Sequence, residues 1–363
     1  MNQRTITTGI AALTVLIMLG ATGCHSDNSA EASTSAVAPD SSIGGAGSTF
    51  VAPLMSAWID GYQHAHPKNL VNYRPIGSGG GIEEFKKGWL NFAASDAPLS
   101  DEEVKAISST IQIPGTAGPV CIIYNLPGLE RPLRLTPEAL AGIYLGTIIS
   151  WQDPAIVREN PGVNLPKAAV IVVHRSDGSG TTNILTTYLS KISHEWSFRS
   201  GNGLSVAWPI GLGADGSKGV LNLVKQSSGT IGYLELSYAK QSGVPVASIQ
   251  NKAGEFVAPT PASADAAIEA FQADLARDVR SPIVDPPASA KDAYPISGFT
   301  FLLLTKDSPN KGNQVALRNF LTYAITTGQE SAEQLSYSKL PPFMQQEAQA
   351  SLMQLTVNGQ PMN

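Results

Sequence analysis

The chain has few residues that could cross-link it or bind a metal. Its 363 residues include two cysteines and five histidines. If Cys24 is acylated, Cys121 has no partner for a disulfide within the chain, and its apolar neighbours favour a small residue of a buried strand over a reactive thiol. The one clustered histidine pair, at residues 64–66, precedes Pro67 without carboxylates at metal-ligand spacing. We therefore expect no metal site.

The chain also lacks any run of basic residues. Its 24 Lys and Arg are outnumbered by 29 Asp and Glu, which gives a formal net charge of −5. Removing residues 1–23, whose only charge is Arg4, makes it −5 − 1 = −6. A nucleic-acid partner is disfavoured. Local dipoles and one or two cations would have to hold any anionic ligand, because the overall field repels it.

The glycine-rich turn at residues 77–81 does not match the dinucleotide-binding motif, and the chain lacks the P-loop ending and the nucleophile elbow of esterases. The glycine-rich turn at residues 77–81 has Ile82 where the dinucleotide-binding motif needs glycine, and no turn ends in the G-K-[ST] of a P-loop. No G-x-S-x-G elbow occurs. These absences favour a protein that is not an enzyme and that needs no cofactor.

The N-terminal apolar stretch at residues 10–19 is too short to span a bilayer comfortably. It follows Arg4 and precedes Cys24, an order typical of an export signal over residues 1–23. The ending ATGC resembles a bacterial lipobox, which implies acylation of Cys24; its alanine replaces the usual leucine, so plain secretion is the alternative. Residues 24–42 carry little apolar mass and should form a flexible tether.

The rest of the chain is rich in glycine (34) and proline (25), with 42% hydrophobic and 15% charged residues, as in an α/β protein of about two domains. Residues 175–181 (RSDGSGT) lie between a β-branched apolar run and a segment with apolar residues at helical spacing. They therefore predict a strand-to-helix turn. Free amides at the helix start suit an anion, although an ordinary capped turn would look similar.

Side chains in this turn strengthen the anion hypothesis. The hydroxyls of Ser179 and Thr181 can face the same point as the amides. Arg175 adds a forked cation suited to phosphate or carboxylate, and Asp177 can orient that guanidinium.

Two further turns, at residues 44–50 and 77–81, also connect an expected strand to an expected helix. The first places Thr49 and Phe50 at a helix start. Asp96 follows a short strand, where α/β proteins place ligands, although it could simply cap an Asx turn.

The domain organisation is suggested by strand-like runs at residues 120–124 and 299–304, which bracket the middle of the chain. They indicate one domain inserted into another through two crossing segments. We expect one lobe from residues 43–119 and 295–363, and a second from residues 120–294.

Five motifs in one order, GAGSTF (45–50), IGSGG (76–80), ASDAPL (94–99), RSDGSGT (175–181) and WPIG (208–211), resemble the phosphate-binding proteins of bacterial phosphate ABC transporters. The resemblance covers nearly the whole chain from residue 43. It implies an α/β, two-lobed periplasmic-binding-protein fold of class II type, with a two-segment hinge and one phosphate buried in the cleft. The residues that it places in the site are Thr49, Phe50, Ser78, Asp96, Arg175, Ser179, Gly180 and Thr181, with Asp177 pairing Arg175.

The same resemblance implies a function: high-affinity binding of inorganic phosphate outside the cytoplasmic membrane and delivery to the permease and ATPase subunits of an ABC transporter. It also implies a monomer in the periplasm or cell envelope, anchored to a membrane through Cys24. Asp96 can accept a hydrogen bond from the hydroxyl group of hydrogen phosphate but meets only lone pairs on sulfate, so it favours phosphate. Alternatives are a binding protein for another oxyanion, a phosphate-ester hydrolase and an extracellular adhesin.

Overall fold

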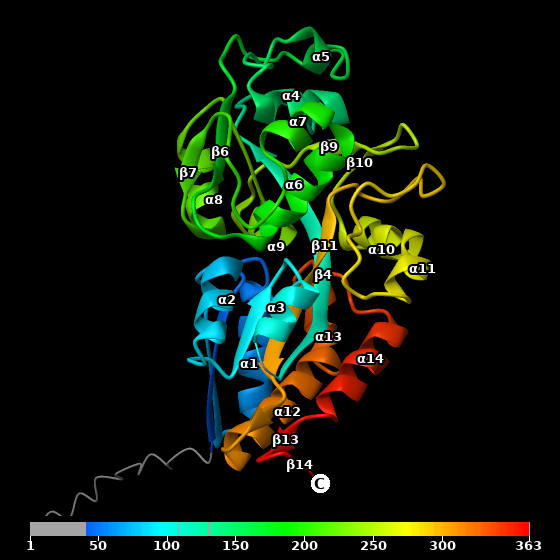
Figure 1. Cartoon of the computed structure of the whole chain (residues 1–363). Coiled ribbons are helices and arrows are strands. Elements are labelled where there is room, and N and C mark those ends of the chain that lie inside the picture. Colours follow the sequence, from blue (N-terminus) through cyan, green and yellow to red (C-terminus); the bar gives the residue numbers. More distant parts are fainter. Residues whose placement is uncertain (1–40, 108, 130, 363) are drawn as a thin grey trace, which may run out of the picture. The chain divides into compact units, whose positions relative to one another are not determined.

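The computed structural model describes residues 41–107, 109–129 and 131–362. The expected export signal, Cys24 and nearly all of the expected tether lie outside these residues. The described part is the mixed α/β fold that we expected (Figure 1). Within it, no helix combines the length and apolar character needed to cross a membrane.

An eight-stranded mixed sheet organises the fold. Its strands, in spatial order, are β2 (Asn69–Arg74), β1 (Ser41–Gly47), β3 (Phe92–Ser95), β11 (Ser297–Thr305), β4 (Thr110–Tyr124), β8 (Thr230–Glu235), β6 (Ile171–Arg175) and β7 (Leu212–Ala214). Neighbouring strands at both ends of this order are parallel, whereas β11 and β4 in the middle are antiparallel to each other and to their outer neighbours.

Strand β4 changes its pairing partner along its length. Residues 110–119 pair with β11, and residues 120–124 pair with β8. The change falls where we expected the chain to pass from one lobe to the other. The division into lobes by residue number stays a prediction.

Strand β4 is longer than the strand-like run expected at residues 120–124. It begins at Thr110 and continues through the PGT sequence at residues 114–116. A shift in the pairing with β11 leaves Gly115 without a partner and brings Pro114 opposite Phe301. A bulge of this kind lets a strand contain proline.

Helices cover the sheet on both sides of this junction (Figure 1). Those nearest in sequence to β1–β3 and β11 are α1 (Ala52–Ala65), α2 (Ser78–Lys86), α3 (Asp101–Ala106), α12 (Lys311–Ile325), α13 (Gln329–Gln334) and α14 (Pro342–Leu352). The middle of the chain supplies α4 (Pro137–Leu145), α5 (Pro154–Val157), α6 (Gly180–Ile192), α7 (His194–Arg199), α8 (Gly216–Gln226), α9 (Leu236–Ser242), α10 (Pro261–Ala270) and α11 (Gln272–Leu275).

Two small sheets complete the described elements. One contains β10 (Phe256–Val257), β9 (Ser248–Gln250) and β5 (Arg134–Leu135), and the other contains β12 (Asp307–Ser308), β13 (Thr356–Val357) and β14 (Gln360–Pro361).

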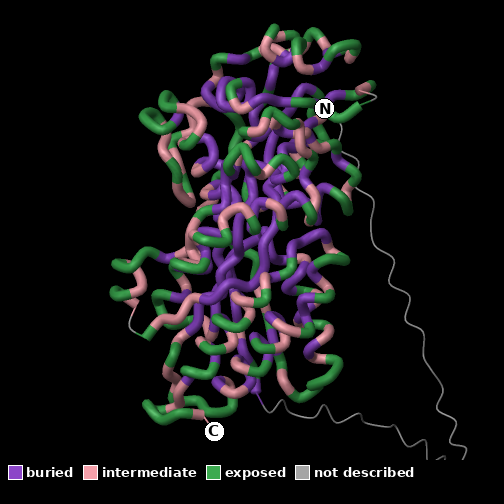
Figure 2. The backbone as a smooth tube through the Cα atoms, turned by 90° about the vertical axis from the view of Figure 1, so that its right-hand side faces the viewer, coloured by how far each residue is buried: buried purple, intermediate pink, exposed green. Residues whose placement is uncertain are grey.

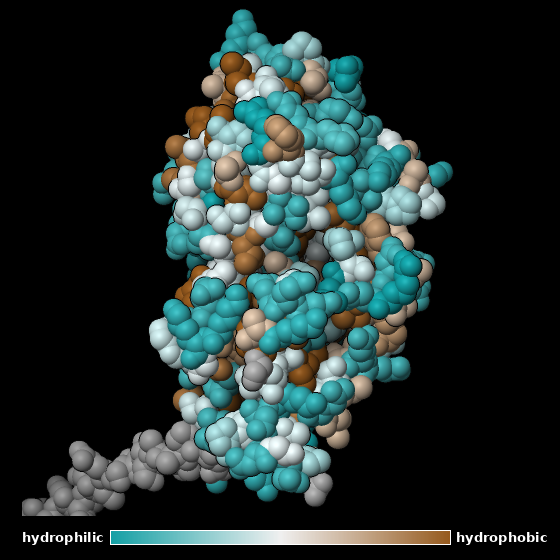
Figure 3. All heavy atoms as spheres, in the orientation of Figure 1, coloured by the Kyte–Doolittle hydropathy of each residue, from teal (hydrophilic) through white to brown (hydrophobic). Residues whose placement is uncertain are grey.

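Apolar side chains fill the space between the sheet and its helices. In Figure 2, the buried segments of the backbone lie in the interior of the described part of the chain. In one part of the core, the rings of Tyr62 and Phe92 both pack against Phe320 of α12. Cys121 is fully buried in β4, as its apolar neighbours predicted. The face drawn in Figure 3 is mostly hydrophilic, with apolar residues scattered across it.

Two local expectations need correction. Strand β1 begins at Ser41, inside the expected tether, because polar contacts extend its pairing with β2: Ser41 Oγ donates to Asn69 Oδ1 at 3.0 Å. Helix α1 begins at Ala52 rather than at Thr49, since the Ser48 hydroxyl accepts the Phe50 amide at 3.0 Å in the preceding bend.

Candidate functional site

Asp96 lies directly after β3 and is buried among hydroxyl groups. Ser48 Oγ donates to its carboxylate, 2.7 Å from Oδ1 and 2.8 Å from Oδ2, and Thr300 Oγ1 of β11 donates to Oδ1 at 2.7 Å. Its backbone amide donates to Ser78 Oγ at 3.2 Å, at the first residue of α2. The predicted residues Ser78 and Asp96 are therefore neighbours, held by polar contacts from three segments.

Arg175 ends β6 and is also buried. Its Nε donates to Asp177 Oδ1 at 2.6 Å, and its Nη2 donates to Asp177 Oδ2. Asp177 also accepts the Gly216 amide from the start of α8 at 3.1 Å. This bidentate arrangement fixes the plane of the guanidinium, as the spacing of the two residues predicted.

The third nitrogen of Arg175 reaches across to the first turn. Its Nη1 donates to Thr49 Oγ1 at 3.0 Å, and that hydroxyl lies 2.9 Å from Ser217 Oγ of α8. Phe50 is fully buried, and its carbonyl accepts the Tyr337 hydroxyl at 2.6 Å. The structure thus brings Thr49 and Arg175, 126 residues apart in sequence, into direct contact.

Gly180 shows how closely the glycine-rich turns approach each other. A Cβ at this position would lie 2.6 Å from Asp96 Cβ, Asp96 Oδ2 and Ser78 Oγ. The Gly79 amide donates to the Gly178 carbonyl at 2.8 Å. Only a residue without a side chain permits this approach.

The first turn of α6 holds the remaining predicted residues. Ser179 is the N-cap, with its hydroxyl accepting the Thr182 amide at 3.2 Å. Thr181 Oγ1 is buried and has no hydrogen-bond partner among the residues that the structure describes. The backbone is held from behind by Tyr233, whose hydroxyl lies 2.5 Å from Thr182 Oγ1 and accepts the Arg175 amide at 3.1 Å.

The two aspartates differ in their electrostatics. Burial raises the pKa of Asp96 to about 6, because it outweighs the lowering effect of its hydroxyl donors and of Arg175. Burial also acts to raise the pKa of Asp177, but the hydrogen bonds and charge of Arg175 outweigh it and hold that pKa below the usual range. The carboxylate of Asp177 is therefore used in its pairing with Arg175, whereas the carboxylate of Asp96 can still accept a hydrogen bond from a ligand.

Three supporting residues were not found from the sequence: Ser48, Thr300 and Ser217. Ser48 lies within a motif that was recognised, so a closer reading could have included it. Thr300 sits in an apolar run and carries no local signal. Ser217 lies in the first turn of α8, whose N-cap Asp215 makes no side-chain capping bond.

The histidines set aside from the sequence are not part of this cluster. His64 and His66 are exposed at the end of α1. His174 stacks on Trp208, with ring centroids 4.8 Å apart, so it has a packing role, as predicted.

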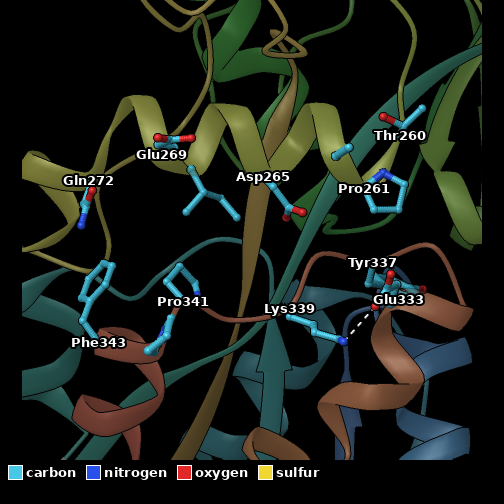
Figure 4. Close-up of a pocket in the computed structure, with 13 residues that line it drawn as sticks. Thr260, Pro261, Asp265, Glu269, Gln272, Glu333, Tyr337, Lys339, Pro341 and Phe343 are labelled. Carbon is cyan, nitrogen blue, oxygen red and sulfur yellow. Dashed lines mark ion pairs between the residues drawn. The ribbon is translucent and has the colours of Figure 1, made fainter.

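A pocket of about 700 Å³ lies elsewhere, between α10 and the segment 333–343 (Figure 4). Asp265, Glu269 and Glu333 line it, and Lys339, the cation beside them, pairs with Glu333 at 2.8 Å. Excess carboxylates repel an anion, and none of the predicted phosphate-binding residues lines this pocket. The predicted phosphate-binding residues lie in the tightly packed cluster around Arg175 instead.

Comparisons with known proteins agree on a family. The model of the PBP superfamily domain matches residues 29–327. Phosphate-binding protein PstS of Xylella fastidiosa is 40% identical over 309 residues, 85% of this chain and 84% of its own length. Phosphate-binding protein PstS of Pasteurella multocida is also 40% identical over 309 residues, 85% of this chain and 89% of its own.

A solved structure shares the fold. The phosphate-binding protein of Stenotrophomonas maltophilia superposes with a TM-score of 0.64 over 85% of this chain and 93% of its own, at 19% identity. The two-lobed periplasmic-binding-protein fold that the motifs implied is thus confirmed.

Proposed function

This chain belongs to the PstS family of phosphate-binding proteins, and we propose that it binds inorganic phosphate outside the cytoplasmic membrane and delivers it to an ABC permease. The observation that carries the proposal is one buried cluster that combines a fixed guanidinium with hydroxyls and one carboxylate that accepts only from hydroxyls. Arg175 supplies the cation, Thr49, Ser78 and Thr181 supply hydroxyls, and Asp96 supplies the acceptor.

The donors proposed to hold phosphate come from three turns. They are the hydroxyls of Thr49, Ser78, Ser179 and Thr181, the amides of Phe50 and Gly180, and the Arg175 guanidinium. Charge-assisted hydrogen bonds contribute about 1.5–3 kcal/mol each before desolvation is subtracted. Together with the start of α6, such donors could hold a buried dianion without help from the net charge of the chain.

Asp96 is the proposed basis of selectivity. A carboxylate can accept a hydrogen bond from HPO₄²⁻ or H₂PO₄⁻, whereas sulfate offers it only lone pairs. Close contact between like charges costs several kcal/mol, and each 1.4 kcal/mol changes affinity tenfold. Sulfate should therefore bind orders of magnitude more weakly than phosphate.

Closure of two lobes is the proposed signal to the permease. Thr49, Ser78 and Asp96 precede residue 120, whereas Arg175 to Thr181 follow it, so phosphate would contact both groups only in a closed state. Because the ligand binds that state better, it stabilises closure. β4 and β11 are the proposed hinge segments, since β4 exchanges one partner strand for another at residue 120.

Export and anchoring complete the proposal. We expect residues 1–23 to be removed and Cys24 to carry lipid, which would hold a monomer near the permease and ATPase subunits and raise its effective concentration there. Globomycin-type inhibition of lipoprotein processing, or Cys24→Ser, should release the protein from membranes; unchanged membrane association would contradict the anchor.

The proposed function is tested by titration calorimetry of the purified protein with phosphate, sulfate and arsenate. We expect tight binding of phosphate, similar binding of arsenate, and sulfate weaker by orders of magnitude. Equal affinity for sulfate would point to a general oxyanion carrier, and no binding at micromolar protein would reject a phosphate receptor. Turnover of phosphate esters with added divalent metals would instead indicate a hydrolase.

A further inference from the structure

A second buried carboxyl group lies beside the phosphate site. Glu235 is the last residue of β8 and is fully buried. Neither of its carboxylate oxygens has a hydrogen-bond partner among the described residues. A buried polar group without a partner is unusual in a folded protein and calls for an explanation.

The surroundings of Glu235 provide no counterion of its own. The cation that acts on it is Arg175, but all three guanidinium nitrogens of Arg175 already donate to Asp177 or Thr49. The Ser217 hydroxyl acts to lower the pKa of Glu235 but makes no hydrogen bond with its carboxylate, and it lies 2.9 Å from Thr49 Oγ1.

The other groups that interact electrostatically with Glu235 do not favour a negative charge on it. They are Asp96 after β3, Cys121 from β4, Tyr238 from α9 and Tyr337 after α13. None of these four groups is a cation. Burial, acting first, and the charge of Asp96 raise the pKa of Glu235 well above its usual range.

We propose that Glu235 is a proton-binding residue of the phosphate site, which holds a proton while the protein is closed around phosphate and releases it to solvent when the lobes separate. The proposal rests on the proposed function, since it requires two lobes that separate. Glu235 belongs to one expected lobe, whereas Asp96 and Tyr337 belong to the other. Separation of those segments would admit water to the carboxyl group, and closure would remove it.

The proton has a function in this position. Arg175 already lies beside two carboxylates, Asp177 and Asp96. An ionised Glu235 would add a further negative charge near the guanidinium that is expected to hold a dianion. Glu235 therefore acts as a positioning residue, and its protonation avoids that added repulsion.

The sign of the pH dependence follows from linkage. The closed state binds one proton more than the open state between the two pKa values of Glu235, so affinity for phosphate falls by up to about tenfold per pH unit as pH rises through that window. Below the window Glu235 is protonated in both states, and its effect on affinity is constant.

Calorimetry of phosphate binding in two buffers of different ionisation enthalpy counts the protons taken up. In a pH series from 5 to 8 we expect the unmodified protein to take up more protons than Glu235→Gln within the window between the two pKa values, by up to about one proton, and affinity of the variant to fall less steeply with pH. The ionisation of phosphate itself cancels in this difference. Glu269→Gln removes an exposed carboxylate of α10 and should match the unmodified protein.

Identical proton counts in the unmodified protein and Glu235→Gln would overturn the proposal. If Glu235→Gln does not fold, infrared difference spectra of the unmodified protein, recorded with and without phosphate, give the answer. A carbonyl band of a protonated carboxyl group should appear on binding and persist in Asp96→Asn; absence of the band would overturn the proposal. If the unmodified protein binds no phosphate, the proposed function itself fails.

Discussion

Asp96 and Asp177 are the same residue type within one small cluster, but their surroundings make them different groups. Asp96 accepts from the neutral hydroxyls of Ser48 and Thr300, and burial raises its pKa to about 6. Asp177 accepts from Arg175 on both oxygens, and its pKa is lowered despite burial. The comparison shows that the partner of a buried carboxylate decides its role.

This difference assigns one task to each carboxylate. Asp177 has its hydrogen-bonding capacity used by Arg175 and by the Gly216 amide, so it positions the cation. Asp96 has its pKa raised to about 6, and it is surrounded by hydroxyl donors that a ligand could displace or share. It is therefore suited to sense whether an anion carries a proton.

Arg175→Ala should have the largest effect, because it removes the cation and converts Asp177 into a second unpaired carboxylate. Loss of a buried, hydrogen-bonded charge pair costs about 4 kcal/mol, so phosphate affinity should fall about 1,000-fold in calorimetry. Arg199→Ala, at an exposed pair with Glu195, is the control and should bind as the unmodified protein does. A loss below tenfold would show that the two aspartates do not differ in the way described.

Asp96→Asn should change selectivity more than affinity. The amide no longer repels sulfate and can donate to it, so the ratio of phosphate to sulfate affinity should fall about 100-fold, equivalent to about 2.7 kcal/mol. Calorimetry with both anions gives this ratio. An unchanged ratio would remove Asp96 from the account of selectivity.

Gly180→Ala tests the close approach between the two aspartate regions. The added Cβ would lie 2.6 Å from Asp96 and Ser78, an overpacking that costs about 1–3 kcal/mol, and we expect affinity to fall about 30-fold. Without phosphate, thermal unfolding should be nearly unchanged, because separation of the proposed lobes would relieve the clash and alanine suits the start of α6. Gly44→Ala has no atom within 4 Å of the new Cβ and serves as the control. Equal affinities in the two variants would contradict the closed geometry.

Thr300→Val should have the smallest effect. It removes a hydroxyl donor that lowers the pKa of Asp96, so that pKa should rise further and phosphate affinity should fall about fivefold, as for one net hydrogen bond. As pH is lowered from 8 to 5, the variant should begin to lose discrimination against sulfate at a higher pH than the unmodified protein. Thr305→Val, on the same strand, should leave that pH profile unchanged.

Much of the fold was predictable because its elements follow sequence patterns within single short segments. The β-branched run before Arg175 gave β6, and the apolar spacing after Thr181 gave α6. The errors came where a distant partner overrode a local signal. A bulge in the pairing with β11 allows β4 to continue through Pro114. A hydrogen bond with Asn69 includes Ser41, a residue of the expected tether, in β1.

The predicted site residues were readable for the same reason, since each lies at a strand end or helix start within a recognisable motif. Thr300 was not, because it looks like any β-branched residue of an apolar strand. It reaches Asp96 only because β11 lies beside β3, with Phe301 opposite Ser95. Glu235 was missed because nothing in its own segment shows that it lacks a partner.

Residues close in the chain define the kinds of groups available: helix starts with free amides, a guanidinium two residues from a carboxylate, and an aspartate after a strand. Three features depend on long-range folding instead. Arg175 donates a hydrogen bond to Thr49, Gly180 lies so near Asp96 that a Cβ would clash, and the pKa values of Asp96 and Asp177 are shifted in opposite directions. A pKa depends on burial and on every charge nearby, and most of those groups come from elsewhere in the chain.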